Sequence, residues 1–540
     1  MKKHQKEHIS SRRDFLRQSA CASLGVTGLV NALAQMKLMT AAMAQSGGHA
    51  GSPYKATVCL FMQGGNDSNN MVIPMGDPAS DEMRSDYETA RGTLAIDRTA
   101  LHTLNLPNSN AFQKHYSGIA SPSLGFHSSA EKLADLFNDG DLSIIANVGT
   151  LAYPLPQRSD YTNNLIPRPN QLFSHSDQTT QWQSSIADQG FKTGWGGRVA
   201  DLINASYNPS TNVSMNISLA GINSYQVGTA GGVSQYIVNP QGAISLDGYN
   251  SGSTANGDYL PYGNAFNNGV DDAAGYKDSN QGARLKAFEK IMNLSHDHLL
   301  ENEYSKVLKS ARVNEGYIGA ATATAGALVM DDPNNSGTDI SIFDHHFRDA
   351  DSKLGDQLKM IAKLIAGRTT LNNNRQIFFC EIRGFDTHQN MLTDHGNLMS
   401  ELANAMEAFR SCLKDPQMAV FDQVTTFTAS DFNRTLTPNG MTAGAGSDHA
   451  WGGHALVMGG AVNGGDVYGH FPSLKIGDTT GSIDAHSTRG RLIPGTSVDQ
   501  YSYVLADWMG VDSNSKEVIF PNINRFDNPL TTTSANLGFL

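Results

Sequence analysis

Five short runs of apolar and β-branched residues punctuate the chain, and each is nearly continuous rather than alternating. They cover residues 57–62, 142–148, 376–382, 424–429 and 456–458. A continuous run of this kind is typical of a strand that is buried on both faces of a parallel sheet. The sequence therefore predicts at least five strands of a central sheet.

Helical patterns lie between these runs. Residues 352–366 place apolar side chains at helical spacing and stop at Gly367, and residues 397–413 repeat the pattern. Near the C-terminus, Ser497 and Gln500 have the spacing of a capping box, which predicts the start of a helix. Strands that alternate with helices indicate an α/β fold with a mostly parallel sheet.

Residues 205–282 depart from this pattern because they are rich in Asn, Gly and Ser. Such a composition favours loops, so we expect a long loop-rich insertion or cap with little regular structure. A long charged helix is predicted to follow, over about residues 284–313.

The N-terminus has the pattern of an export signal. Arg12 and Arg13 are followed by Phe15-Leu16, a weakly apolar stretch and Ala-Met-Ala at 42–44. We predict a twin-arginine signal peptide over residues 1–44 and a mature domain over residues 45–540, so the protein is expected to be periplasmic or secreted. The alternative for this segment is a basic amphipathic helix. Twin-arginine export carries folded proteins, which favours a cofactor loaded before export.

Composition excludes several classes of function. The formal net charge of -12 argues against nucleic acid and anionic membrane surfaces as main partners. No segment of the mature chain approaches the roughly 18 apolar residues of a membrane span. Cys59, Cys380 and Cys412 form no CxxC pair, which excludes zinc–thiolate clusters and c-type haem.

Polar side chains follow the predicted third strand. Glu381 lies at its end, and Asp386 and His388 come shortly after it, two residues apart. In an extended chain two such residues face the same side. Carboxylates and imidazoles are ligands of divalent metals, so this segment is a candidate metal site. A polar surface loop is the alternative.

Two other strand ends carry similar groups. Asp67 follows the first strand and the turn Gly64-Gly65, and is read either as a turn residue or as a metal ligand. Asp431 and Arg434 follow the fourth strand. Arg434 suits a phosphate or sulfate oxygen, whereas Asp431 is a ligand or a helix cap.

Two loops add further candidates. The glycine-rich segment GAGSDHAWGGH supplies Asp448, His449 and His454 just before the last strand. In FSHSDQ, Ser174 precedes His175 and Ser176 follows it. A hydroxyl beside an imidazole is a candidate nucleophile, or the N-cap of a helix.

Taken together, the motifs GGND, FSHSDQTTQW, GWGGR, RQIFF, GFDTH, ASDFNRT, SDHAWGGH and GGAVNGGDVYG resemble the DUF1501 family of exported bacterial proteins. That family in turn resembles the alkaline phosphatase and sulfatase superfamily. The resemblance implies an α/β fold built as a three-layer α/β/α sandwich, alkaline phosphatase-like, with metal ligands at the strand ends.

The resemblance also implies roles. One or two divalent ions (Zn, Mn, Mg or Ca) are expected, Ser174 is the nucleophile with Ser176 in reserve, and His175 and Arg434 assist. The implied ligands are Asp67, Glu381, Asp386, His388, Asp431, Asp448, His449 and His454.

One departure from the superfamily pattern stands out. Phe432 follows Asp431 where the superfamily has a histidine. The site then holds a single metal, or His449 and His454 supply the missing nitrogen, or the protein is an inactive relative. No serine or cysteine lies in the C/S-x-P-x-R motif of formylglycine sulfatases, which argues against that class.

The resulting hypothesis is an exported metal-dependent hydrolase or transferase that acts on a phosphate or sulfate ester of a small molecule or glycan. The alternative is a non-catalytic cell-envelope protein on the same scaffold, which binds glycans or assembles with other envelope proteins.

Overall fold

The computed structural model describes residues 51–107, 110–119, 121–190, 193–229, 232–242, 252–253, 259–260, 262–269, 274–292, 314–477, 489–531, 533 and 535–540. The predicted signal peptide and most of the helix predicted over 284–313 lie outside these residues.

A nine-stranded sheet forms the centre of the fold. Its order is β15-β5-β14-β13-β1-β12-β6-β7, and β16 pairs with β5. The strands are β1 (Lys55–Gln63), β5 (Leu142–Gly149), β6 (Asn216–Ser218), β7 (Tyr236–Ile237), β12 (Arg375–Arg383), β13 (Val424–Ser430), β14 (Gly453–Met458), β15 (Val467–Gly469) and β16 (Thr496–Ser497). Only β14 runs antiparallel to its neighbours, β13 and β5. The fold is therefore α/β with a large mixed, mostly parallel sheet.

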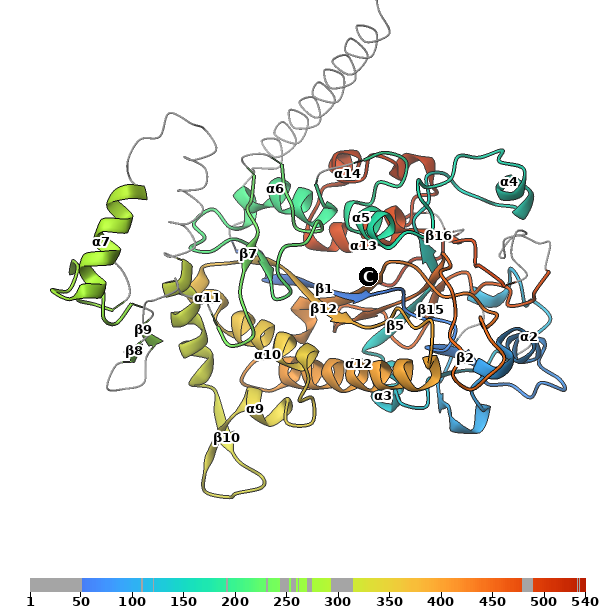
Figure 1. The fold of residues 1–540 in the computed structure, drawn as a ribbon, viewed down its shortest axis with the longest axis horizontal. Coiled ribbons are helices and arrows are strands. Elements are labelled where there is room, and N and C mark those ends of the chain that lie inside the picture. Colours follow the sequence, from blue (N-terminus) through green and yellow to red (C-terminus); the bar gives the residue numbers. More distant parts are fainter. Residues whose placement is uncertain are drawn as a thin grey trace, which may run out of the picture.

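Helices cover both faces of this sheet (Figure 1). On one face lie α3 (Glu131–Asn138), α10 (Lys353–Ala366) and α12 (Met391–Lys414), and on the other α5 (His175–Ser184), α6 (Trp195–Tyr207), α13 (Val498–Met509) and α14 (Lys516–Ile519). Within the described residues, no helix combines the length and apolar character that crossing a bilayer requires.

Smaller elements complete the fold. They are β2 (Val72–Pro74), α2 (Glu82–Arg91), β3 (His102–Thr103), β4 (Leu124–Phe126), α4 (Arg158–Thr162), β8 (Gly252–Ser253), β9 (Tyr259–Leu260), α7 (Asn280–Met292), β10 (Val329–Asp331), β11 (Asp339–Ser341), α9 (Ile342–His346) and α11 (Arg368–Leu371).

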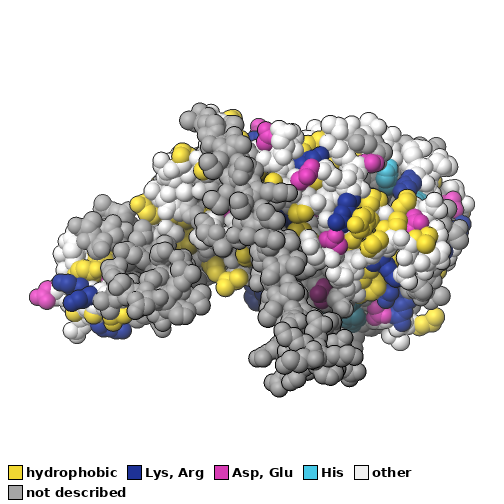
Figure 2. All heavy atoms as spheres, turned by 90° about the horizontal axis from the view of Figure 1, so that it is seen from above, with side chains coloured by type: hydrophobic (Ala, Val, Ile, Leu, Met, Phe, Trp, Pro, Cys, Tyr) yellow, Lys and Arg dark blue, Asp and Glu magenta, His cyan; other side chains and the backbone are white. Residues whose placement is uncertain are grey.

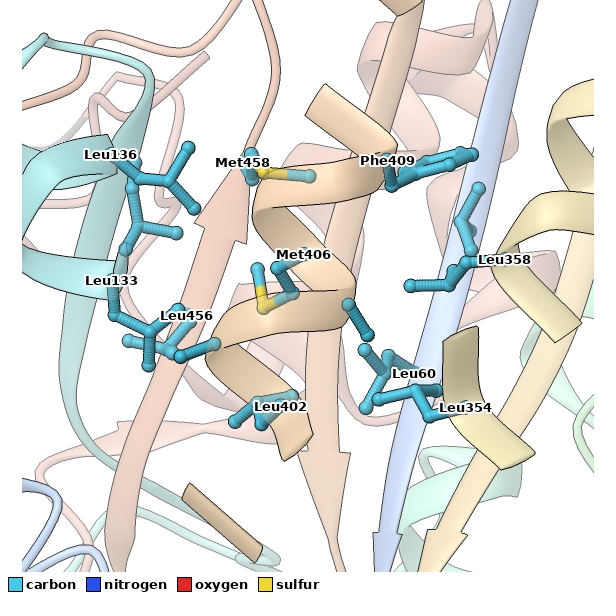
Figure 3. Close-up of a cluster of buried hydrophobic side chains, with 14 of the residues drawn as sticks. Leu60, Leu133, Leu136, Leu354, Leu358, Leu402, Met406, Phe409, Leu456 and Met458 are labelled. Carbon is cyan, nitrogen blue, oxygen red and sulfur yellow. The ribbon is translucent and has the colours of Figure 1, made fainter. Parts of the chain in front are cut away.

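The continuous apolar character of β1 follows from its position between two cores. Val58 and Leu60 point into the core under α10 and α12, whereas Cys59 and Phe61 point into the core under α6 and α13. Figure 3 shows Leu60 in the first core, with Met406 of α12 and Leu358 of α10 close by. Alternate residues of a strand face opposite sides, so a strand covered on both sides needs apolar residues throughout.

All five predicted strands are present, as β1, β5, β12, β13 and β14. The three predicted helices are confirmed as α10, α12 and α13, and α13 begins with the predicted capping box of Ser497 and Gln500. Cys59, Cys380 and Cys412 are buried free thiols.

The Asn/Gly/Ser-rich segment 205–282 differs in part from expectation. Two short stretches of it, β6 and β7, extend the central sheet beyond β12. Strands of two or three residues are too short for a hydrophobic pattern to reveal. Farther along, Tyr262 and Phe266 pack with Leu285 of α7 in a small separate apolar cluster.

The face above the sheet carries mixed charge. Figure 2 looks onto the molecule from the side of α5, α6 and α13, and shows Lys and Arg side chains interspersed with Asp and Glu around apolar ones.

Candidate functional site

Three neighbouring parallel strands, β12, β1 and β13, end at the same edge of the sheet and bring their following loops together. The loop after β1 passes very close to the loop after β12: a Cβ on Gly64 would lie 2.5 Å from the backbone nitrogen of Asp386. Gly64 also has a φ of 113°, which favours glycine. The turn at Gly64 therefore lets polar groups from separate strand ends meet.

Three polar side chains converge near this edge of the sheet. One potential ligand atom from each of His175, Asp386 and His449 lies within 4.8 Å of the other two. Nε2 of each histidine is 3.5 Å from Oδ1 of Asp386. The histidines come from the first turn of α5 and from the loop before β14, so elements far apart in sequence build the group.

Hydrogen bonds fix the orientation of both imidazoles. Nδ1 of His175 donates to Oδ2 of Asp431 at 2.7 Å, and Nδ1 of His449 donates to the carbonyl of Phe173 at 2.8 Å. Carboxylate and carbonyl oxygens only accept, so Nδ1 carries the proton and Nε2 presents its lone pair to the centre of the group. Histidine ligands of metal ions are held in this way in proteins.

His388 is a fourth member of the cluster. Its Nε2 lies 3.1 Å from Oδ1 of Asp386 and 3.0 Å from Nε2 of His449. Its Nδ1, on the far side of the ring, lies 3.3 Å from Oδ1 of Asp448. We call His175, Asp386, His388 and His449 the His/Asp cluster.

The electrostatic environment favours the metal-binding protonation state of three members of the cluster, all except His175. Burial opposes ionisation of Asp386, but the hydrogen bond and charge of Arg434 outweigh it and lower the pKa of Asp386. Burial and the charge of Arg434 lower the pKa values of His388 and His449, which favours neutral imidazoles. For His175 the hydrogen bond to Asp431 raises the pKa, although burial opposes this. A metal ion at His175 would therefore have to displace a proton that this imidazole holds more tightly than an ordinary histidine does.

Asp431, predicted as a ligand, lies behind His175 and not in the cluster. It is 1% exposed, its Oδ1 accepts from the backbone of Gly64 at 3.2 Å, and its Oδ2 accepts from His175. Both oxygens are engaged, so Asp431 positions an imidazole.

Phe432 forms an apolar wall on the cluster. Its ring centroid lies 4.7 Å from that of His175 and 4.6 Å from that of His449. It is 3% exposed and contributes no donor atom. A second ion on this side of the two histidines would meet a hydrocarbon ring, so the geometry favours a single ion.

Asp67, the first predicted ligand, makes a buried ion pair instead. Oδ2 accepts from Nη2 of Arg91 at 2.5 Å, Oδ1 accepts from Asn69 at 3.1 Å, and the Asp67 and Arg91 side chains are fully buried. Burial raises the pKa of Asp67 although Arg91 opposes this. Arg91 also donates to the carbonyls of Thr435 and Leu436, so the pair ties the loop after β1 to the loop after β13.

Replacing Arg91 by methionine is expected to lower the free energy of unfolding by about 3–5 kcal/mol, because it leaves the Asp67 carboxylate buried and unpaired. Urea unfolding followed by circular dichroism measures the loss. The double variant Asp67→Leu/Arg91→Met, which removes both charges, should recover a large part of it. A single variant as stable as the wild type would contradict a structural role for the pair.

Glu381 and His454 also lie away from the cluster. Glu381 pairs with Arg383 and lines a separate cavity of about 510 Å³ with Lys353 and Glu401. His454 points into the core, stacks on Phe471 with ring centroids 5.0 Å apart, and accepts a hydrogen bond from the backbone of Asn147. Burial lowers its pKa to about 3.

Asp448 and Arg434 border the cluster. Asp448 contacts His388 and makes an ion pair with Arg489. Arg434 is fully buried and donates to Asp386 at 2.6 Å, to the carbonyl of Gly65 at 2.9 Å, to that of Ser447 at 3.2 Å and to that of Gly64. Its donors are directed at the protein, so it braces loops and holds Asp386 rather than a substrate.

Ser174 is the N-cap residue of α5, next to His175, and makes no side-chain capping bond. Its Oγ donates to Oδ2 of Asp177 at 2.6 Å. Ser176 is more exposed, and its Oγ lies 3.4 Å from the same carboxylate oxygen.

Three contributors escaped sequence reasoning. The carbonyl of Phe173 accepts from His449, and Arg491 stacks on the ring of Phe173, so both act through backbone geometry and packing. Arg91 lies on α2 outside any motif. Asp386, His388 and His449 were found because they follow or precede strands.

A family described as "Protein of unknown function (DUF1501)" matches residues 54–519. The chain belongs to this family. The DUF1501 match spans every member of the His/Asp cluster. No curated protein matches the chain. A solved structure titled "Crystal structure of Ps i-CgsB in complex with k-i-k-neocarrahexaose" matches at 9% identity and a TM-score of 0.28, over 88% of this chain and 78% of that one. The likeness of this DUF1501 member to alkaline phosphatases stays a prediction.

Proposed function

We propose that this DUF1501 protein is an exported, periplasmic or secreted, metal-dependent hydrolase or transferase that acts on a phosphate or sulfate ester, on an alkaline phosphatase-like sandwich. The observation that carries the proposal is the convergence of His175, Asp386 and His449. Both histidines are held from behind by acceptors, as ligands of a metal are.

The donor set fits a divalent ion. His175, Asp386 and His449 would hold it, with His388 as a further ligand. Nitrogen-rich sets favour zinc over manganese, magnesium and calcium, which prefer oxygen ligands. Such an ion supplies Lewis acidity, which stabilises negative charge that develops on the ester oxygens.

The residues of the chain suggest the nucleophilic step. Oγ of Ser174 attacks the phosphorus or sulfur atom and gives its proton to Oδ2 of Asp177, 2.6 Å away. The bond to the leaving oxygen breaks, and the alcohol leaves after taking a proton from solvent. Water, or an acceptor alcohol in a transferase, then releases the group from Ser174.

The test is the metal content of the natively exported protein together with its hydrolysis of nitrophenyl phosphate and nitrophenyl sulfate. We expect close to one divalent ion per chain, loss of hydrolysis on chelation, and recovery on adding the same ion. A chain that stays empty after incubation with zinc, manganese, magnesium and calcium would refute the proposal.

One observation favours the alternative, a non-catalytic cell-envelope protein that binds glycans or envelope partners. The guanidinium of Arg434 already neutralises Asp386, and its Nη1 lies 3.4 Å from Nε2 of His388. Because the positive charge of Arg434 already balances the Asp386 carboxylate, the cluster can be stable without a bound metal ion. The same metal measurement separates the two functions.

A further inference from the structure

Arg491 lies beside the His/Asp cluster in a fixed orientation. Its guanidinium carbon stands 3.9 Å from the ring centroid of Phe173, and its Nε donates to the backbone carbonyl of His449 at 3.2 Å. Phe173 in turn accepts from the imidazole of His449. Arg491, Phe173 and His449 thus hold one another, and the arginine is placed next to a candidate metal ligand.

The backbone of Phe173 supports this arrangement. Its φ is 73°, a left-handed conformation that is uncommon for a bulky residue. The conformation directs the carbonyl to His449 while the ring carries Arg491. One residue therefore orients both an imidazole and a guanidinium.

A second arginine lies two positions earlier. Arg489 makes an ion pair with Oδ2 of Asp448, whose Oδ1 faces Nδ1 of His388. Arg491 thus contacts His449 directly, and Arg489 is linked to His388 through Asp448. The two bring positive charge to the border of the cluster in a chain whose net charge is -12.

Arg434, the arginine predicted from sequence to hold the substrate, is occupied by the protein. It is fully buried, and its guanidinium donates to Asp386 and to the carbonyls of Gly64, Gly65 and Ser447. Arg491 lies at the border of the same cluster, is half-buried, and has its guanidinium plane set by the ring of Phe173.

We propose that Arg491, assisted by Arg489, binds the non-bridging oxygens of the tetrahedral phosphate or sulfate group of the substrate. A planar guanidinium matches two oxygens of such a group, and stacking on an aromatic ring sets its plane in advance. Local positive charge also attracts an anionic substrate to an acidic protein. The inference rests on the proposed function for its substrate class, but not for the binding of the oxyanion itself.

The experiment compares Arg491→Gln with wild type by titration calorimetry, with inorganic phosphate and inorganic sulfate as probes. We expect the dissociation constant of at least one of these anions to rise by about tenfold or more, the scale of one charge-assisted hydrogen bond. Metal content and melting temperature should be unchanged. Arg491→Lys, which keeps the charge without the planar fork, should fall between the two.

Arg168→Gln is the matched control. Arg168 also stacks on an aromatic ring, 4.6 Å from the centroid of Tyr161, and donates to Asn164, which is not a member of the cluster. Its substitution should leave anion binding within about twofold. An Arg491→Gln protein that binds both anions like wild type, an equal loss in Arg168→Gln, or a wild-type protein that binds neither anion would overturn the proposal.

The outcomes also separate this inference from the proposed function. A wild-type protein without metal whose anion binding depends on Arg491 would keep the oxyanion site and reject the metal-dependent hydrolase. A protein with metal and hydrolysis in which Arg491→Gln leaves both anion binding and KM unchanged would do the reverse.

Discussion

Replacing Asp386 by alanine is expected to empty the candidate metal site and to lower the hydrolysis of a phosphate or sulfate ester by about 10³-fold or more. Asp386 supplies the only carboxylate oxygen of the converging group, and it lies within 3.5 Å of both His175 and His449. Loss of the partners behind a ligand already costs about 10–100-fold in metal affinity, and loss of a ligand should cost more. Lewis acidity contributes several kcal/mol, which corresponds to the expected change in rate.

Metal analysis of the purified variant and its steady-state rate check this result, and Asp448→Ala is the matched control. Asp448 is also a carboxylate near His388, but it lies behind that ring, as its contact is with Nδ1. We expect Asp448→Ala to keep its metal and to lose less than about tenfold in rate. Thermal unfolding shows whether Asp386→Ala still folds, because Arg434 loses an ion-pair partner. A folded Asp386→Ala protein with wild-type metal content would contradict the ligand assignment.

The sheet was predictable because hydrophobic pattern and burial are directly linked in it. Strands such as β1 lie between two cores, so their apolar runs are continuous and visible. Strands β6 and β7, at the edge of the sheet, are two or three residues long and lie in a polar, glycine-rich segment. Their sequence does not distinguish them from a loop, because two or three residues are too few to show the hydrophobic pattern of a strand.

The candidate site was predictable where a strand end alone places the side chain. Asp386 and His388 follow β12 and are directed to the cluster. Asp67 follows β1 in the same way, yet its carboxylate turns to Arg91 of α2. That partner lies on a helix whose docking is set by tertiary packing, so the sequence does not show which of the two destinations the carboxylate takes.

His454 illustrates the opposite error. It follows a glycine-rich loop, as His449 does, but it is the second residue of β14, where its side chain faces the core. A shift of one residue along a strand changes which face a side chain occupies. The loop residue His449 remains free to reach the cluster, whereas His454 is stacked on Phe471.

Arg434 connects the two functional hypotheses. Its positive charge lowers the pKa of Asp386 and thereby keeps that carboxylate ionised, which a metal ligand requires. The same charge competes with an ion for Asp386, as their 2.6 Å contact shows. A divalent ion bound here would have to offset part of this ion pair, and the affinity measured for the wild type would report how well the three imidazole nitrogens do so.

Ser174→Ala is expected to reduce ester hydrolysis by about 10³-fold or more while leaving the metal content unchanged, because loss of a nucleophile removes the covalent step itself. Ser176→Ala is the matched control: it removes the same hydroxyl two residues away, from a side chain that is more exposed and farther from the Asp177 oxygen that receives the proton. Its rate should fall by less than about tenfold.

Peptide mass analysis of protein quenched during turnover supplies a second measurement. A phosphoryl or sulfuryl group should be found on Ser174 in the wild type and in Ser176→Ala. If Ser174→Ala kept most of the activity and no serine carried the group, direct attack by water would replace the covalent route. The metal-site proposal would survive that result, because the His/Asp cluster contains neither serine and its geometry serves both routes.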